Sequence, residues 1–228
     1  MKAIVVTAYL SMFARQSCYA AMLLGCLTRP ALAQDQATTP GTPTTVTPTY
    51  RVGDTWTFVY GRTDSKPGTS VVQTVVEVTE KQTALSSSKN GGPPHEVDFD
   101  NQGNLTRVGD EATYEPSLGS LSFPMMVGKS WDSHHVRRFT SGTLDVSAHI
   151  EVVAFERVQV LAGSFDAYKI VSRGVNAKQL ERLYSAPVTA TYWYAPSVKR
   201  VVKSDYALYL NHQALTETFE LVAFSLAP

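Results

Sequence analysis

Apolar and polar side chains alternate with a period of two residues along most of this sequence, and this feature most constrains its fold. Such alternation is typical of strands with one buried face, since helices repeat near 3.6 residues. The pattern occurs at 55–60, 71–81, 144–156, 156–161, 165–172 and 217–226. Turn residues separate these segments at 67–68, 90–94, 102–104, 162–164 and 195–196. The sequence therefore predicts an all-β fold: an antiparallel curved sheet or half-open β-barrel of about ten strands.

Two segments carry more specific expectations. In the valine-rich segment 71–81, Val72 and Val76 share a face opposite Gln73, so we expect the valine face to pack inward. Residues 176–185 alone favour a helix, because strong helix formers there place leucines on one side. The prediction therefore includes at most one short helix.

The aromatic run "TYWY" precedes a turn and a strand rich in valine and basic residues, which predicts a hairpin over 191–206. Neighbours on a strand point to opposite faces, so Trp193 faces one way and Tyr192 and Tyr194 the other. One ring then packs inward, and tyrosines or basic stems cover the other face. The alternative is a ligand groove. The candidate ligand-lining residues are Trp56, Trp131, Tyr192, Trp193 and Tyr194. Trp131 and Phe165 are also expected to anchor the core.

Residues 1–33 are expected to be a signal peptide. Basic residues precede an apolar run at 19–27, and Ala31 and Ala33 offer the small side chains that a signal peptidase selects. No later apolar stretch reaches the eighteen residues of a membrane-spanning helix. Two alternatives stay open: Cys26 as the lipid-modified residue of a lipobox, and Met12 as the initiator.

After this leader, residues 34–49 are mostly Thr and Pro and are expected to form a disordered linker. A single β domain would then occupy 50–228. Both cysteines, Cys18 and Cys26, leave with residues 1–33, so the mature chain has no thiol for a disulfide or a zinc-thiolate site. The cleaved chain has 17 basic and 20 acidic residues, a balance that does not favour nucleic-acid binding.

A short echo links two places in the chain: "VGDTW" at 52–56 returns as "VGKSW" at 127–131. Each copy leads into a predicted strand, with Gly providing a turn and Trp an anchor. A repeated strand entry explains the echo, and a duplicated half-sheet is the alternative.

No motif compels a catalytic or metal chemistry. The stretch 98–103 begins like a calcium loop but lacks the final glutamate, so we interpret it as a hairpin turn. The neighbours His134 and His135 point to opposite strand faces, so a shared ion would need Asp132 or His149. The carboxylates available for sugar hydrolysis are Asp98 with Asp100, and Glu151 with Glu156. A G-x-S-x-G elbow is absent from the sequence. We therefore assign no catalytic, cofactor or metal residue.

Two motifs, "VLAGSFDAYKI" at 160–170 and "YWYAPSVKR" at 192–200, resemble a family of uncharacterised bacterial exported β-proteins. The resemblance covers about 50–226 and includes "VGKSW" between 127 and 131. It implies an exported β domain and brings no catalytic residues. The hairpin is more loosely similar to the periplasmic lipoprotein carriers, half-open barrels around an apolar cavity.

Two functions follow from these features. The first is a non-catalytic periplasmic or envelope-associated domain that binds an apolar or amphipathic ligand, without a cofactor. The second is a structural or assembly protein that meets an envelope protein through its sheet face or edge. A hydrolase without a recognisable motif comes third. The expected location is the periplasm, or the membrane surface if Cys26 is lipidated.

Overall fold

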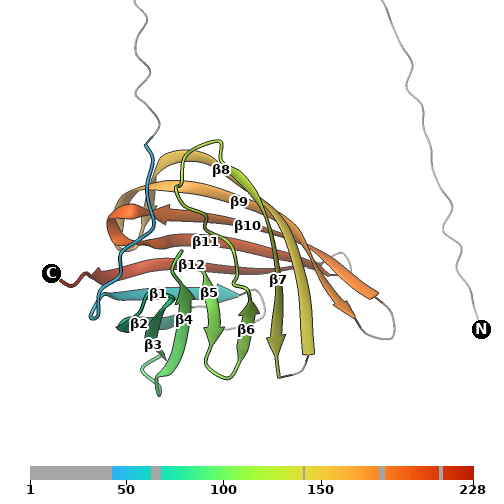
Figure 1. The fold of residues 1–228 in the computed structure, drawn as a ribbon, viewed down its shortest axis with the longest axis horizontal. Helices are drawn as coiled ribbons and strands as arrows, with labels where there is room; N and C mark the ends of the chain where they lie inside the picture. The colour runs from blue at the N-terminus through green and yellow to red at the C-terminus, as the bar shows by residue number, and fades with distance from the viewer. Residues whose placement is uncertain (1–42, 63–67, 141, 180–182, 211–212) are drawn as a thin grey trace, which may run out of the picture. The chain divides into compact units, whose positions relative to one another are not determined.

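The computed structural model describes residues 43–62, 68–140, 142–179, 183–210 and 213–228. These residues form a closed antiparallel β-barrel of twelve strands (Figure 1). The strands are β1 (Thr55–Arg62), β2 (Thr69–Val78), β3 (Gln82–Lys89), β4 (His95–Asp100), β5 (Leu105–Val108), β6 (Ala112–Glu115), β7 (Ser130–Phe139), β8 (Gly142–Val160), β9 (Gly163–Gln179), β10 (Leu183–Ala195), β11 (Arg200–Leu210) and β12 (Gln213–Ser225). The all-β prediction is confirmed, and the sheet is closed rather than half-open.

Every strand pairs with its neighbours in the sequence, so the barrel is an up-and-down meander. Pairing of β1 with β12, from Thr55 opposite Ser225 to Arg62 opposite Glu217, closes it. Closure gives each of the twelve strands two partners, so no strand is a free edge along its whole length, although β6 pairs with only residues 136–139 of β7. No helix among the described residues is long and apolar enough to cross a membrane.

The predicted helix at 176–185 is wrong. Residues 176–179 end β9, residues 183–185 begin β10, and the three residues between them are outside the described part of the chain. Ala177 pairs with Asp145 of β8 and with Ser185 of β10. Pairing on both sides outweighs a local helix preference of a few tenths of a kcal/mol per residue. The one described helix is the single 3₁₀ turn η1 (Pro196–Val198), which joins β10 to β11.

The inward face of β2 is the opposite of the one expected. Gln73 and Val75 are buried, whereas Val72 and Val76 are 38% and 50% exposed. Valines occur at both parities of this segment, so the alternation does not identify the inner face. A β-bulge between Val75 and Glu77 also breaks the simple period.

The two Val-Gly strand entries have the same local structure. In each, the glycine N–H donates to the carbonyl of a buried valine on the next strand, and the carbonyl of the following residue accepts from that valine's N–H. The two sets are Gly53, Asp54 and Val75, and Gly128, Lys129 and Val152. In each set the residue after the valine lies at a bulge. The sequence echo thus corresponds to a repeated strand entry.

The core consists of two clusters. Trp56, Phe58 and Leu221 are fully buried in the first, and Tyr168 and Tyr194 in the second. The tryptophan and phenylalanine expected as anchors are only partly buried. Trp131 packs beside the second cluster, and Phe165 lies beside the first and contacts the 40%-exposed ring of Phe224.

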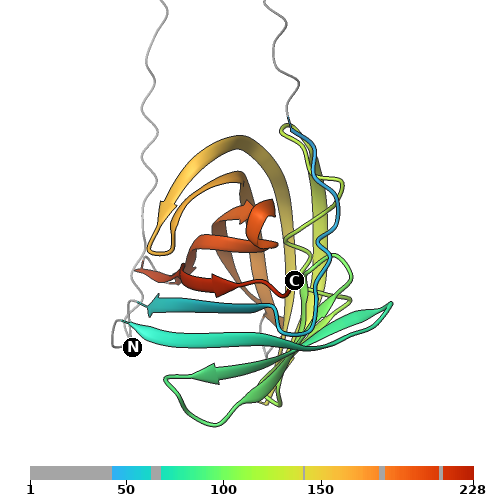
Figure 2. The same cartoon turned by 90° about the vertical axis from the view of Figure 1, so that its left-hand side faces the viewer.

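Two irregular segments run side by side along the barrel, as Figure 2 shows for residues 43–50 and the loop 116–129. Thr45 and Met125 exchange two backbone hydrogen bonds, of 3.0 and 2.8 Å. The hydroxyl of Tyr168 donates to the carbonyl of Pro43. Residues 43–49, which the sequence assigned to the linker, therefore contact the barrel. The remainder of that linker lies outside the described residues.

Candidate functional site

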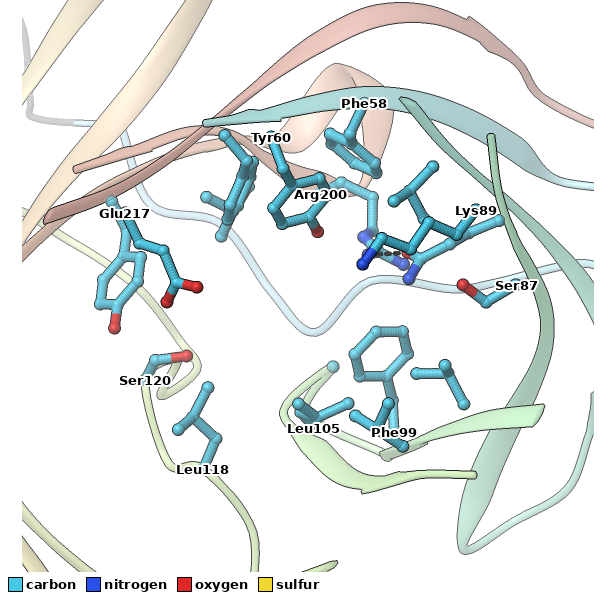
Figure 3. A pocket seen from close by; sticks show the side chains of 18 of the residues that line it. Phe58, Tyr60, Ser87, Lys89, Phe99, Leu105, Leu118, Ser120, Arg200 and Glu217 are labelled. Atoms are coloured by element: carbon cyan, nitrogen blue, oxygen red, sulfur yellow. Dashed lines mark hydrogen bonds between the residues drawn. The ribbon is translucent and has the colours of Figure 1, made fainter. Parts of the chain in front are cut away.

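A cavity of about 510 Å³ lies inside the barrel (Figure 3). Ligand-binding cavities in proteins commonly measure about 300–1,000 Å³, so this volume suits a small organic molecule. The residues that line it come from eight strands, from the turns, from Tyr50 ahead of β1 and from the loop 116–129. They are Tyr50, Phe58, Tyr60, Gly61, Arg62, Thr69, Val71, Gln73, Ser87, Lys89, His95, Val97, Phe99, Gly103, Leu105, Val108, Glu111, Leu118, Ser120, Leu121, Tyr192, Arg200, Val201, Glu217 and Phe219.

The period-two alternation of the strands explains which apolar side chains line the cavity. Phe58 and Tyr60 are two positions apart on β1, and Val97 and Phe99 are two apart on β4, so each pair shares an inward face. The rings of Phe58, Tyr60 and Phe219 lie 5.4–6.5 Å apart between centroids. One wall of the cavity is therefore a continuous aromatic surface.

The loop 116–129 contributes another wall, and Asn104 holds it in place. The buried Asn104 side chain donates to the carbonyl of Leu121 at 3.0 Å and accepts from its N–H at 2.7 Å. The amide thereby pairs with Leu121 as a backbone strand would. Trp131 adds a bond from its indole nitrogen to the carbonyl of Gly119. These contacts fix Leu118 and Ser120 against the cavity.

The charged group deepest in this lining is Arg200, the first residue of β11. Its guanidinium lies 4.6 Å from the ring centre of Phe99, 4.9 Å from Trp56 and 5.6 Å from Phe58. Nη2 donates to Oε1 of Gln73 at 2.8 Å. Burial lowers the pKa of Arg200, but an arginine starts so high that it stays protonated at neutral pH.

Three tyrosines that line the cavity are held in their neutral form. Burial raises the pKa of Tyr50 to about 12, and it also raises the pKa of Tyr60 and Tyr192 above their ordinary values. None of these hydroxyls therefore provides a negative charge near neutral pH. Each remains a hydrogen-bond donor, as Tyr50 is to the carbonyl of Lys199.

The rim of the cavity carries charges of both signs. Arg62 Nε lies 3.7 Å from Oε1 of Glu217, and both side chains are about half exposed. Lys89 and Glu111 are further lining residues at exposed positions. The cavity thus has a polar mouth, an aromatic middle and a cationic end.

The structure places the five predicted ligand-lining residues in different surroundings. Tyr192 lines the cavity. Trp56 is fully buried at the end of the cavity, under the guanidinium of Arg200, and its indole nitrogen donates to the carbonyl of Val198. Tyr194 is buried in the second core cluster against Phe123.

Trp131 and Trp193 also contribute no lining, so Tyr192 is the one candidate of the five that lines this cavity. Trp131 supports the loop through Gly119, as described above. Trp193 lies on the face of β10 opposite Tyr192, with its ring 5.5 and 5.3 Å from the ammonium groups of Lys169 and Lys203. The predicted alternation is correct, but the expectation that the tryptophan is the inward ring is wrong. Tyr192 of β10 lies opposite the buried Ser204 of β11, so the two residues share the inward face.

The histidines follow the predicted opposite faces. His134 is exposed and lies 2.8 Å from Oδ1 of Asp145, whereas His135 is buried beside Tyr114. His149 contacts Oδ1 of Asp132 at 2.7 Å on the exposed face. Burial lowers the pKa of His135, which favours its neutral form. Among the described residues, no group of three or more potential ligands could hold a metal ion.

The four candidate carboxylates have separate surroundings. Asp100 accepts from the N–H groups of Gln102 and Asn104, so the stretch 98–103 contains the predicted hairpin turn. Asp98 pairs with Nε of Arg107 at 2.7 Å. Glu156 accepts a hydrogen bond from the indole N–H of Trp193, and Glu151 of β8 lies opposite Ser130 of β7. Cys26 and the rest of residues 1–42 lie outside the described residues.

Comparison with known proteins was made through family models, curated sequences and solved structures. No family model matches the chain, and no curated protein matches it significantly. A candidate exported protein with a YmcC-like fold from Bacteroides fragilis is 16% identical, with a TM-score of 0.51 over 79% of this chain and 99% of that chain. A candidate lipoprotein from Parabacteroides distasonis is 11% identical, with the same TM-score and coverage. The hypothetical lipoprotein YmcC from Escherichia coli K12 is 12% identical, with a TM-score of 0.45 over 75% of this chain and 89% of that chain.

At these identities the first two structures show a shared fold alone. Their descriptions are those of an exported protein and a lipoprotein, in agreement with the expected resemblance to exported bacterial β-proteins. The resemblance of the two sequence motifs and the looser resemblance to lipoprotein carriers stay predictions.

Proposed function

We propose that this protein is a non-catalytic binding module that holds an apolar or amphipathic small molecule inside its barrel. The observation that carries the proposal is the cavity of about 510 Å³ with its aromatic wall. A protein interior is normally packed to the density of an organic crystal, so a space of this size is uncommon in a purely structural domain. Apolar walls with a few polar groups are typical of ligand sites.

The assembly alternative receives less support. It predicts a solid core, and its edge-strand version requires an unpaired strand. Each of the twelve strands has a partner on both sides for at least part of its length, so no described strand is the free edge that this version needs. Exposed apolar side chains such as Val76 and Phe224 do occur, but exposed residues of this kind are ordinary on protein surfaces.

We also propose that the protein is exported, with cleavage after Ala33 and a location in the periplasm or at the envelope. The signal-peptide pattern at 1–33 and the descriptions of the two structural neighbours support this location. A ligand in that compartment would come from the envelope or from the medium.

Titration with an apolar fluorescent probe, N-phenylnaphthylamine, tests the binding proposal. We expect saturable binding at one site per chain. Leu105→Trp adds bulk to the cavity lining. It should weaken probe binding at least about tenfold, because the tryptophan ring would fill part of the volume that the probe needs. Leu161→Trp adds the same bulk at a side chain that is 67% exposed and should leave binding unchanged. Equal binding to both variants would contradict a site inside the barrel.

A further inference from the structure

Arg200 is a cavity-lining cation whose charge is not neutralised by the protein. Within the described part of the chain, no carboxylate lies at ion-pair distance from its guanidinium, and Nη1 is buried without a hydrogen-bond partner. The neighbouring Lys199 differs, since its ammonium is 2.7 Å from Oδ2 of Asp54. Leaving a charge buried and unpaired is costly, so such groups are normally paired.

The groups around Arg200 stabilise the charge without cancelling it. Three aromatic rings offer their negative faces, and Gln73 offers a neutral amide oxygen. Hydrogen bonds between a guanidinium and a carboxylate are stronger than these contacts, and the planar fork of arginine matches the two carboxylate oxygens. The guanidinium is therefore suited to an anion of planar, bidentate shape.

The register of β1 and β2 places this cation at the inner end of the cavity. Trp56, under the guanidinium, pairs with Gln73, whereas Tyr60 pairs with Thr69 near the mouth. Trp56 and the rim residue Arg62 are six positions apart on β1, which corresponds to about 20 Å at about 3.3 Å per residue. Phe58 and Tyr60 line the path between the two ends.

We propose that the ligand is a single-chain amphiphile with a carboxylate head group, bound head first with the carboxylate on Arg200. This inference rests on the proposed function and names its ligand class. The chain of the ligand would lie against Phe58, Tyr60 and Phe219 and extend toward the rim. Figure 3 shows Arg200 in the pocket between Phe58 and Tyr60 on one side and Phe99 and Leu105 on the other.

Charge and volume define the ligand further. One guanidinium balances the single charge of a carboxylate, whereas a phosphate monoester carries about 1.5 to 2 negative charges at neutral pH. The cavity of 510 Å³ accommodates roughly seventeen groups the size of a water molecule, at about 30 Å³ each. A fatty acid of medium length fits within this limit, and a lipid with two long chains exceeds it.

Calorimetric titration of the purified, delipidated chain tests the proposal with three probes of equal chain length. These are decanoate, decanol and decyl phosphate. We expect decanoate to bind about ten- to a hundredfold more tightly than decanol, the range for hydrogen bonds to a charged group. Decyl phosphate should bind more weakly than decanoate. Tighter binding of the phosphate would overturn the carboxylate assignment.

Two variants of cavity-lining cations locate the head group. Arg200→Met keeps a long apolar stem and should lose the preference for decanoate while still binding decanol. Lys89→Met, at an exposed lining position, should retain the preference. A preference that survives in Arg200→Met, or disappears only in Lys89→Met, would place the carboxylate elsewhere and contradict the inference.

A measurement on the unchanged protein covers the case in which Arg200→Met does not fold. Decanoate with an isotope-labelled carboxyl carbon can be titrated with acid in its bound state by NMR. A guanidinium beside the carboxylate should lower its pKa below that of free decanoate. A bound pKa equal to or above the free value would overturn the inference.

The calorimetric outcomes separate this inference from the proposed function. Equal affinities for decanoate and decanol would leave a binding module without a carboxylate subsite. No binding of any probe, together with no binding of N-phenylnaphthylamine, would remove both.

Discussion

At the residue scale, Asp54 joins three separate parts of the chain. Its fully buried carboxylate accepts from the N–H of Arg51, from the ammonium of Lys199 at 2.7 Å and from the N–H of Ala227. Burial alone would raise its pKa, but these hydrogen bonds outweigh burial and hold the pKa below its ordinary value. The start of β1, the η1 turn and the C-terminus are thereby fixed together beside Arg200.

We predict that Asp54→Asn lowers the free energy of unfolding by about 3 kcal/mol at neutral pH, because Lys199 loses its buried partner. The depressed pKa stabilises the native state fully above the unfolded-state pKa of about 3.9, and this contribution is lost as the pH falls through the lower native pKa. The variant should lack this acid-dependent loss.

Urea denaturation at several pH values measures both effects. Asp166→Asn removes an exposed partner of Arg157 and should change stability by less than about 0.5 kcal/mol. Equal losses in the two variants would contradict the role of Asp54.

Sequence reasoning reached part of the site at this scale. Alternation correctly placed Tyr192 opposite Trp193, and it also puts Arg200 on the same parity as Val202 and Ser204, both of which are buried. That shared parity is the signal that could have identified a buried cation. The parity does not tell whether the arginine side chain lies along the sheet or points its guanidinium into a cavity. That depends on residues of β1, β2 and β4, which surround the guanidinium but are distant in the sequence.

At the element scale, the long strands β8 and β9 depend on close backbone contact. Gly174 pairs with Ala148, and a Cβ atom at position 174 would lie 2.7 Å from Cβ of Ala148 and would clash with the carbonyl oxygen of Ser147. The obstacle is largely backbone, which cannot move without disturbing the ladder. A glycine in the middle of a strand thus has a packing cause here.

We predict that Gly174→Ala lowers the free energy of unfolding by about 1–3 kcal/mol, the usual cost of overpacking. Val175→Ala changes the adjacent, 42%-exposed position and should cost less than about 1 kcal/mol. Thermal and urea unfolding measure both. A neutral or stabilising Gly174→Ala would show that the two strands are further apart than described.

The elements themselves were predictable where turns are marked by residue type. Gly163, at the β8–β9 turn, has a φ of +125°, a conformation that side chains with a Cβ rarely adopt. The helix predicted at 176–185 failed because local preference is small beside the pairing of two long strands. The prediction of which face of β2 points inward failed because valines occur at both parities and a bulge shifts the register.

At the scale of the whole molecule, the pairing of β1 with β12 closes the sheet around a cavity that no local pattern predicts. The all-β class follows from the alternation, but closure depends on the pairing of segments more than 150 positions apart. The cavity depends in turn on the loop 116–129, which Asn104 holds through Leu121. Such long-range contacts decide whether the interior is solid or hollow.

Native mass spectrometry of the protein purified gently from the periplasm, followed by solvent extraction, tests the central claim most directly. We predict one adduct per chain that is lost on denaturation, with an amphiphile in the extract and a protein mass that starts at Gln34. A bare protein mass with nothing in the extract, at protein concentrations where N-phenylnaphthylamine also fails to bind, would contradict the account of this barrel as a ligand-binding module.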